Sequence, residues 1–225
     1  MTAVPVIAID GPSASGKGTV AQAVARALGF HYLDSGALYR VVGVAAMSVV
    51  ADLDDETEIL AILLKINIKF ESGLVLLDGI DVTETIRTEP ASDAASRVAA
   101  HRSVRQALLA LQRSFCVMPG LAADGRDMGS VVFPGAILKI YLTASAEARA
   151  QRRYKQLIGK GLDANMAALL QDIRNRDERD STRAVAPLKK CPDAVEIDTT
   201  GMSAEQATAR VLALYGQMQQ AQRAS

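Results

Sequence analysis

The sequence is short of the residues on which several classes of protein depend. Its 225 residues include no tryptophan, only nine Tyr and Phe residues, two histidines and two cysteines, and 25 Lys and Arg balance 25 Asp and Glu. So few aromatics and no net positive charge argue against a nucleic-acid-binding protein. Two cysteines without a CxxC spacing argue against a disulfide scaffold or a thiolate metal site, and favour free thiols in a reducing cytosol.

Long hydrophobic stretches are missing as well. No run of eighteen apolar residues occurs, and the first residues lack the basic and apolar regions of a signal peptide. We therefore expect no membrane partner and a cytoplasmic location. The length and the 49% apolar content fit one globular domain, or one core with small insertions.

The first thirty residues have the pattern of a phosphate-binding loop between a strand and a helix. An apolar run at 6–9 ends at Asp10, and a glycine-rich loop leads into a helix-forming segment at 17–28. In this Gly-x4-Gly-Lys pattern the glycines let backbone N–H groups face a phosphate, and the lysine reaches its outer oxygens. The residues predicted to bind ATP are Gly11, Pro12, Ser13, Ala14, Ser15, Gly16, Lys17, Gly18 and Thr19.

The loop departs from the usual pattern where a metal is normally held. Gly18 stands at the position at which a Ser or Thr hydroxyl ligates Mg²⁺ in other P-loops. Thr19, the next residue, and Asp124, which ends an apolar run at 121–123, are the candidate metal residues, acting through water. A turn-forming aspartate before Gly125 explains Asp124 nearly as well.

Apolar β-rich runs alternate with helical segments along much of the chain, which predicts an α/β fold. The expected architecture is a P-loop NTPase-type parallel sheet flanked by helices, with a small antiparallel-β and helical insertion. Within that insertion Asp78-Gly79, between two β-rich runs, is a strong hairpin signal. The further core strands are expected at 30–33, 121–123, 136–142 and 195–197.

The second half of the chain is predicted to be mainly helical. A helix capped by Asp163 is expected to run to about Asp180, and a closing helix is expected at 203–217. The tail from Met218 to Ser225 is predicted to be disordered.

One part of this neutral chain is strongly basic. Residues 149–190 hold eleven Lys and Arg against five acids, which suggests a small polyanionic ligand rather than a polymer. Spacings of four and three place Arg176, Asp180 and Arg183 on one helical face if the helix continues. The guanidinium fork suits phosphate, although an exposed ion-pair helix is the simpler alternative.

Two further groups of polar residues follow predicted strands. Asp34, Ser35 and Arg40 come after the second strand, and Arg126-Asp127 follows Asp124. The carboxyl ends of parallel strands form the crevice in which α/β proteins bind ligands. Together with the loop, these groups suggest a second anionic ligand beside ATP, although helix N-caps and a solvated arginine explain the first group equally well.

Several of these motifs resemble those of one enzyme family. The ending Gly16-Lys17-Gly18-Thr19 is typical of nucleoside monophosphate kinases, and the resemblance to bacterial cytidylate kinases covers nearly the whole chain. The motifs that carry it are Asp34-Ser35-Gly36-x-x-Tyr39-Arg40, Asp124-Gly125-Arg126-Asp127-Met128-Gly129 and Arg176-Asp177-x-Arg179-Asp180-x-x-Arg183, with the β-meander at 65–87.

The resemblance implies transfer of the γ-phosphoryl group of ATP to CMP or dCMP, in pyrimidine nucleotide metabolism. It implies Mg²⁺ supplied as Mg-ATP. No general base stands out among the residues, so we expect that none is essential. From the compact, neutral chain we expect a monomer without nucleic-acid partners. The resemblance further implies a division into a P-loop core, a monophosphate-binding insertion and a closing lid. The expected bounds are 1–37, 101–152 and 184–225 for the core, 38–100 for the insertion and 153–183 for the lid.

The resemblance also assigns roles to single residues. Ser96, Arg105 and Asp127 would read the cytosine edge, Asp180 would touch the sugar, and Arg152 and Arg153 would face ATP from the lid. The implied catalytic residues are Lys17, Arg126, Arg176 and Arg183. The implied CMP-binding residues are Ser35, Arg40, Ser96, Arg105, Arg126, Asp127, Asp180 and Arg183.

Three alternative functions stay open at this point. Another small-molecule P-loop kinase, acting on UMP, AMP or a non-nucleotide such as shikimate, would share Lys17 and the lid. A P-loop regulatory switch would bind nucleotide without an acceptor, but it would leave the basic lid unexplained. A nucleic-acid-binding ATPase fits the composition least well.

Overall fold

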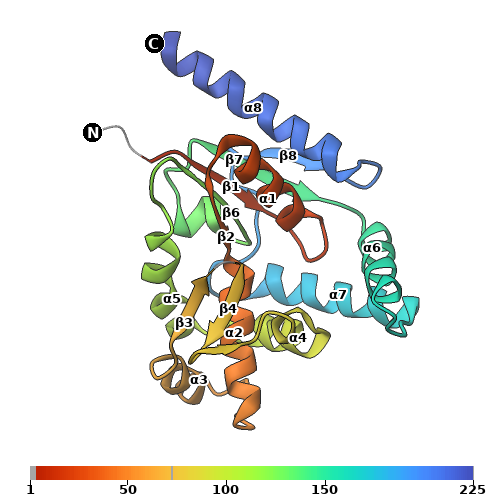
Figure 1. Cartoon of the computed structure of the whole chain (residues 1–225). Helices are drawn as coiled ribbons and strands as arrows, with labels where there is room; N and C mark the ends of the chain where they lie inside the picture. The colour runs from red at the N-terminus through yellow and green to blue at the C-terminus, as the bar shows by residue number, and fades with distance from the viewer. Residues whose placement is uncertain (1–3, 72, 225) are drawn as a thin grey trace. The chain divides into compact units, whose positions relative to one another are not determined.

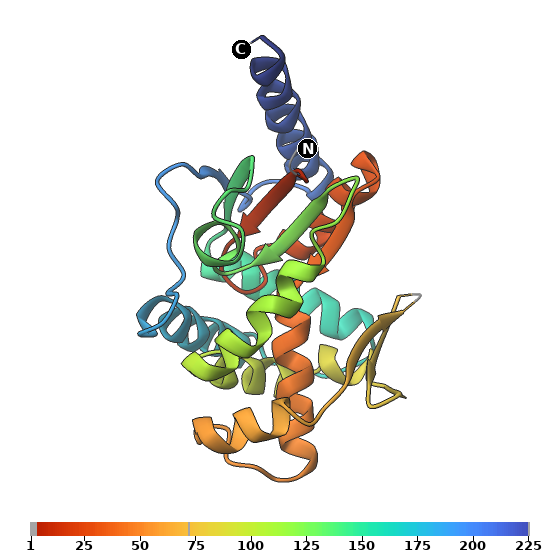
Figure 2. The ribbon, with the colours of Figure 1, turned by 90° about the vertical axis from the view of Figure 1, so that its left-hand side faces the viewer.

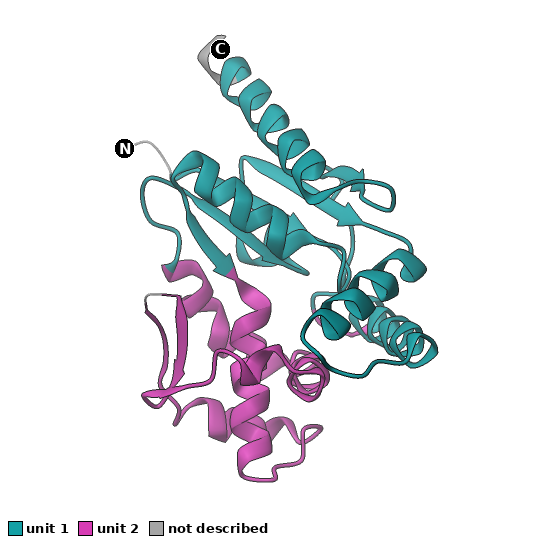
Figure 3. Ribbon diagram, turned by 45° about the vertical axis from the view of Figure 1, so that its right-hand side comes forward, with its two compact units in different colours: residues 1–33, 115–182, 186–225 teal, residues 34–114, 183–185 magenta. Residues whose placement is uncertain are grey.

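The computed structural model describes residues 4–71 and 73–224 (Figure 1). They form two compact units, coloured separately in Figure 3. Unit 1 comprises residues 1–33, 115–182 and 186–225, and unit 2 comprises residues 34–114 and 183–185. None of the helices in the described part of the chain is long and apolar enough to cross a membrane.

A five-stranded sheet is the centre of unit 1, in the order β2-β6-β1-β7-β8. β1 lies in the middle and pairs in parallel with β6 and β7, and β7 pairs in parallel with β8. Every residue of β1 and β6 is buried, as expected for strands that are covered on both faces. The strands are β1 (Val6–Asp10), β2 (His31–Asp34), β6 (Leu121–Gly125), β7 (Leu138–Thr143) and β8 (Val195–Asp198).

Helices pack on this sheet through short apolar stripes. Val20 and Val24 of α1 and Val211 and Tyr215 of α8 join the strands in one buried cluster. The ring of Phe30 meets Tyr215 edge-on, with centroids 5.8 Å apart. The helices of unit 1 are α1 (Lys17–Leu28), α6 (Ala146–Gly159), α7 (Met166–Thr182) and α8 (Ala204–Ala224), with a π-helical turn at Met128–Val132. The predicted P-loop α/β fold is confirmed.

Unit 2 combines helices with the predicted meander. Strands β3, β4 and β5 form an antiparallel sheet in chain order. Asp78 and Gly79 both have positive φ, 51° and 84°, as a two-residue hairpin turn requires. The elements are α2 (Ser35–Ser48), α3 (Glu56–Leu63), β3 (Ile68–Glu71), β4 (Leu74–Leu77), β5 (Ile80–Asp81), a 3₁₀ turn (Thr85–Arg87), α4 (Glu89–Val98) and α5 (Arg102–Ser114).

One prediction about α7 was wrong and one was confirmed. Asp163 does not cap the helix, because the Ala168 N–H donates to Asn165 Oδ1, three residues before it. The helix ends at Thr182, close to the predicted end near Asp180, so the condition that would place Arg183 on the same helical face as Arg176 and Asp180 is not met. The Leu188 N–H donates to the Asp180 carbonyl at 2.7 Å, so the chain has already turned away from the helix axis.

The prediction of a disordered tail was also wrong for Met218 to Ala224, which continue α8. Tyr215 is buried, and its hydroxyl accepts a hydrogen bond from Gln219 at the i+4 position. The end of α8 extends beyond the rest of unit 1 in both views (Figures 1 and 2). Ser225 lies outside the described residues.

We predict that Gly43→Ala destabilises the protein, because α2 and α4 approach most closely at this residue. A Cβ at position 43 would lie 2.8 Å from Ala94 Cβ and 3.2 Å from the backbone of Ala94 and Ala95. We expect a loss of about 1–3 kcal/mol in the free energy of unfolding, measured by urea titration. Gly216→Ala is the control. Nothing lies within 4 Å there, so α8 should gain about 0.5–1 kcal/mol. Equal effects of the two changes would show that close packing against α4 does not restrict position 43.

Candidate nucleotide site

The glycine-rich loop between β1 and α1 is tightly built. Gly11 has no room for a side chain, because a Cβ would lie 2.0 Å from Leu142 O. Gly16 has φ 90° and begins α1 as its N-cap, without a capping side chain, so the first N–H groups of the helix face the loop. Lys17 is 9% exposed, and its Nζ donates to Pro12 O at 3.1 Å. The lysine therefore lies folded over the loop.

The carbonyl oxygens of this loop are held from outside by side chains. Arg149 Nη1 donates to Ser13 O at 3.1 Å. Arg152 Nη1 donates to Ser15 O at 3.3 Å, and Thr199 Oγ1 donates to the same oxygen at 3.1 Å. With the Ser13 and Ser15 carbonyls bound by these side chains, the loop can turn N–H groups toward a phosphate. The Ser15 Oγ is buried there without a hydrogen-bond partner among the described residues.

Asp124 is the residue that best fits a role in holding Mg²⁺. It lies at the end of β6 and is 5% exposed. A Cβ at position 18 would lie 3.0 Å from its Oδ2, so Gly18 leaves the space beside this carboxylate open. The described residues contain no group of three or more His, Cys, Asp or Glu that could hold a metal. One carboxylate suits Mg²⁺ that is bound mainly by phosphate and water. Thr19 is exposed on α1, and its role stays a prediction.

Asp10, at the end of β1, fixes the chain that follows β6. It is 5% exposed, and its carboxylate accepts hydrogen bonds from the Met128 and Gly129 N–H groups at 2.7 and 2.8 Å. Burial raises the pKa of Asp10 from its ordinary 3.8 to about 6, although both backbone donors oppose the change. The segment with Arg126 and Asp127 is therefore anchored directly beside the loop.

Arg126 and Asp180 are brought together in unit 1. Arg126 Nε donates to Asp180 Oδ2 at 2.6 Å, and Asp180 is 6% exposed. Burial disfavours the charged guanidinium, but the adjacent Asp180 carboxylate outweighs it, so the pKa of Arg126 is raised. Arg126 therefore stays charged at every physiological pH. Asp127 next to it is 3% exposed.

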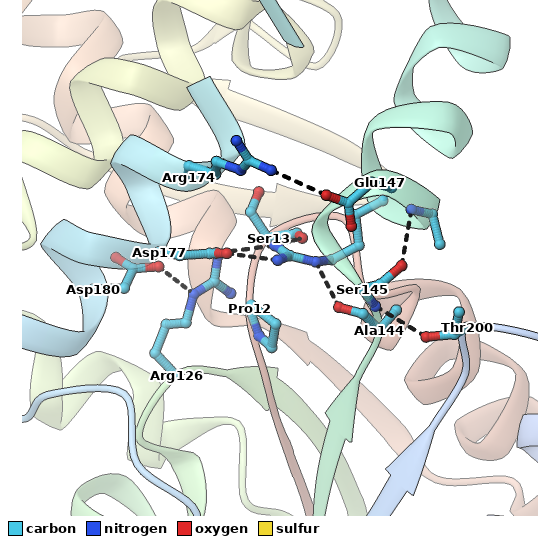
Figure 4. Close-up of polar contacts among 12 residues, drawn as sticks. Pro12, Ser13, Arg126, Ala144, Ser145, Glu147, Arg174, Asp177, Asp180 and Thr200 are labelled. Atoms are coloured by element: carbon cyan, nitrogen blue, oxygen red, sulfur yellow. Dashed lines mark hydrogen bonds and ion pairs between the residues drawn. The ribbon is translucent and has the colours of Figure 1, made fainter. Parts of the chain in front are cut away.

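Further arginines connect α6 and α7 in the same unit. Arg149 is 4% exposed and forms a two-pronged pair with Asp177, with Nη1 at 2.9 Å from Oδ1 and Nη2 at 2.5 Å from Oδ2. Figure 4 shows Asp177 and Asp180 on neighbouring turns of α7, with Ser13 beside them. Arg176 lies on α7 and Arg153 on α6. The sequence analysis assigned no role to Arg149, and it named Asp177 only as a member of a motif.

The predicted phosphate residues of unit 2 lie at the start of α2. Asp34 is the N-cap of this helix and accepts from the Ala37 N–H at 2.9 Å, as the capping alternative predicted. Its other oxygen pairs with Arg40 Nη2 at 2.6 Å. Ser35 is not a cap, because its hydroxyl donates to Gln112 Oε1 at 2.8 Å. The pair with Asp34 positions the Arg40 guanidinium, and the buried Arg40 Nε has no hydrogen-bond partner among the described residues.

The other predicted residues of unit 2 are spread over three segments. Arg105 of α5 is 8% exposed, donates to Ala99 O at 3.1 Å and lies over the Tyr39 ring, 5.4 Å from its centroid. Ser96 lies on α4, and its Oγ is buried with no hydrogen-bond partner in the described part of the chain. Arg183 belongs to the short segment 183–185. Of the residues predicted to read the base, Ser96 and Arg105 belong to unit 2 and Asp127 belongs to unit 1.

A P-loop beside a buried carboxylate, on a parallel sheet with β1 at its centre, defines a P-loop nucleotide-binding protein. Comparison with known proteins gives the family. A family model described as cytidylate kinase matches residues 7–217, and the chain belongs to the cytidylate kinase family. The cytidylate kinase of Nitrosomonas europaea is 53% identical over 97% of this chain and 98% of that protein. That of Burkholderia pseudomallei is 54% identical over 96% of this chain and 95% of that protein.

Solved structures give a more distant likeness. A gluconokinase from Sinorhizobium meliloti is 17% identical, with a TM-score of 0.44 over 96% of this chain and 99% of that chain. This match adds nothing to the family assignment.

Asp10 generates a prediction about stability and pH. The Asp10 carboxyl binds its proton more tightly in the folded protein than in the unfolded chain. Its contribution to the free energy of unfolding is therefore fully present below pH 3.8 and is lost as the pH rises through about 6. We expect the stability advantage of wild type over Asp10→Asn to shrink by about 2 kcal/mol between roughly pH 4 and pH 7.5. Urea unfolding at several pH values measures it.

Asp193→Asn provides the opposite control. Lys139 lowers the pKa of this exposed carboxyl, so its contribution is present at high pH and is lost as pH falls. If the stability advantage of wild type over Asp10→Asn stayed constant or grew with pH, the raised pKa of Asp10 would be contradicted.

Proposed function

We propose that this protein transfers the γ-phosphoryl group of ATP to CMP or dCMP, giving ADP and CDP or dCDP. The observation that carries the proposal is the loop at 11–16, whose Ser13 and Ser15 carbonyls accept hydrogen bonds from Arg149, Arg152 and Thr199. Membership of the cytidylate kinase family supports the acceptor.

Catalysis by this site would consist of alignment and charge neutralisation. Phosphoryl transfer passes through a loose transition state with little covalent chemistry for the protein, so we propose no essential general base. Lys17 would bind the outer phosphates of ATP from its place over the loop. Arg126, Arg176 and Arg183 would balance the charge that develops on the transferred group. Arg126 suits this role because it is charged and partly buried.

Mg²⁺, bound as Mg-ATP, would neutralise phosphate oxygens and favour the leaving of ADP. Asp124 would hold it from the end of β6, with Thr19 as a second, water-mediated contact. Arg152 and Arg153 would contact ATP from α6. Residues 153–183 would close as a lid and exclude water, which limits ATP hydrolysis. We expect a monomer in the cytoplasm, without nucleic-acid or membrane partners.

The acceptor-binding residues of the proposal are those that the family's motifs indicate. Ser35, Arg40 and Arg183 would hold the phosphate of the acceptor, and Asp180 its sugar. The buried, unpartnered Nε of Arg40 and Oγ of Ser96 support this proposal, because buried polar atoms cost free energy unless a partner completes them. Ser96, Arg105 and Asp127 would read cytosine, with the Asp127 carboxylate accepting from the amino group at C4.

The test is ATP consumption with Mg²⁺ against CMP, dCMP, UMP, AMP and GMP, with a control that lacks an acceptor. We expect strong turnover with CMP and dCMP, weak turnover with UMP and none otherwise. Lys17→Ala should abolish turnover without unfolding the protein. Preference for another monophosphate would overturn the acceptor. ATP turnover that needs a protein partner and no acceptor would favour the regulatory switch.

Asp127→Ala tests how the base is read. A uracil carbonyl would face the Asp127 carboxylate without a hydrogen bond, so UMP should be the poorer substrate. We expect the ratio of kcat/KM for CMP over UMP to fall by about tenfold or more in the variant. Asp193→Ala, which removes an exposed carboxylate paired with Lys139, should keep the ratio. A folded Asp127→Ala variant with the wild-type ratio would refute this role.

A further inference from the structure

A single buried arginine, Arg149, contacts the phosphate-binding loop and α7 at once. From α6 it donates through Nε to Ala144 O at 2.9 Å, through Nη1 to Ser13 O at 3.1 Å, and through both Nη atoms to Asp177. The side chain is only 5% exposed. Because a buried charge is costly unless it is paired, none of these partners can move far without breaking the set.

Asp177 belongs to the turn of α7 that carries proposed catalytic residues. Arg176 precedes it, and Asp180 lies one turn further along the same helix. Asp180 pairs with Arg126, so α7 has two carboxylates held by arginines from the body of unit 1. Of these two arginines, Arg149 is the one that also holds a carbonyl of the loop.

We propose that Arg149 is a positioning residue which couples the conformation of the phosphate-binding loop to the placement of α7. This inference rests on the proposed function, because it concerns how the residues of α7 reach their places once nucleotide is bound. Nucleotide bound in the loop would hold the backbone of Ser13 in place. The Ser13 carbonyl would then orient the Arg149 guanidinium, and Arg149 would hold Asp177 and the turn of α7 around it. In this proposal Arg149 acts through Ser13 and Asp177, its partners in the structure, and not on the reacting atoms.

The chemistry of arginine explains why this position suits it. The planar guanidinium has five N–H donors in fixed directions, so one side chain can serve two carbonyls and a carboxylate together. Lysine keeps the charge but offers a compact ammonium on a flexible stem. Arg149→Lys therefore separates the presence of charge from the geometry of the contacts.

The chain offers a matched control between the same two helices. Glu147 of α6 accepts a hydrogen bond from Arg174 of α7 at 3.0 Å, and both side chains are more than half exposed (Figure 4). This pair joins α6 to α7 but does not contact the loop in any of the described interactions. Exposed pairs of this kind contribute little. Glu147→Gln should therefore leave coupling and activity unchanged.

The experiment measures amide hydrogen exchange in residues 166–182, with and without saturating ADP, in the full-length protein. Wild type should exchange more slowly in α7 when ADP is bound. Asp177→Asn should bind ADP with nearly wild-type affinity but lose this slowing, because the loop contact of Arg149 is kept and the contact to α7 is weakened. Arg149→Lys should weaken ADP binding as well, and Asp177→Glu should restore part of the slowing.

Steady-state kinetics provide the second readout. With saturating ATP and CMP, Asp177→Asn should lower kcat by about tenfold or more, as expected when catalytic groups are misplaced, while KM for ATP changes little. A purely structural pair would lower the melting temperature without this split between kcat and KM.

Two outcomes would overturn the coupling. One is a wild-type α7 that does not respond to ADP, and the other is an Asp177→Asn variant that keeps both the slowing and the wild-type kcat. Because the exchange measurement uses ADP alone, it does not depend on the acceptor. A wild type whose α7 responds to ADP but which phosphorylates no monophosphate would overturn the proposed function and still support the coupling.

Discussion

A phosphate-binding loop must turn its N–H groups to one side, and its carbonyl oxygens must then find partners on the other. In this protein Arg149, Arg152 and Thr199 supply those partners, and Gly11 passes so close to Leu142 that no side chain fits. The rest of unit 1 depends on this constraint. The helix α6 must bring two arginines to the loop, and the segment after β8 must bring Thr199.

Buried carboxylates and their partners also hold in place the segments of unit 1 that surround the loop. Asp10 fixes the backbone after β6, and two arginine–aspartate pairs hold α7. Because each pair is largely shielded from water, removing one partner leaves a charge that the surroundings cannot solvate. These interactions therefore specify where Arg126, Asp180 and Arg176 lie more than they add to overall stability. A kinase of this class needs such placement, because alignment is most of its catalysis.

The sequence predicted the fold well where local chemistry and periodicity agree. The loop at 11–16, the strand β6 ending in an acid, and the Asp78-Gly79 hairpin were all found as expected. It failed where two signals compete over a few residues. An acid at 163 looked like the cap of α7, but the chain uses Asn165, two residues further along. At the C-terminus polar composition suggested disorder, whereas α8 continues to Ala224.

By itself the sequence determined the P-loop, the α/β class and, through its motifs, the residues proposed to bind nucleotide. It could not show that Arg149 pairs with Asp177, because both stand in a segment rich in charged residues and the pairing joins positions 28 apart in the sequence. Nor could it show that Ser35 donates to Gln112, 77 positions away along the chain, while Asp34 both caps α2 and pairs with Arg40. Tertiary structure decided these roles. A polar or charged side chain that is buried must replace water with hydrogen-bond partners from the protein, and folding brings those partners from distant parts of the chain.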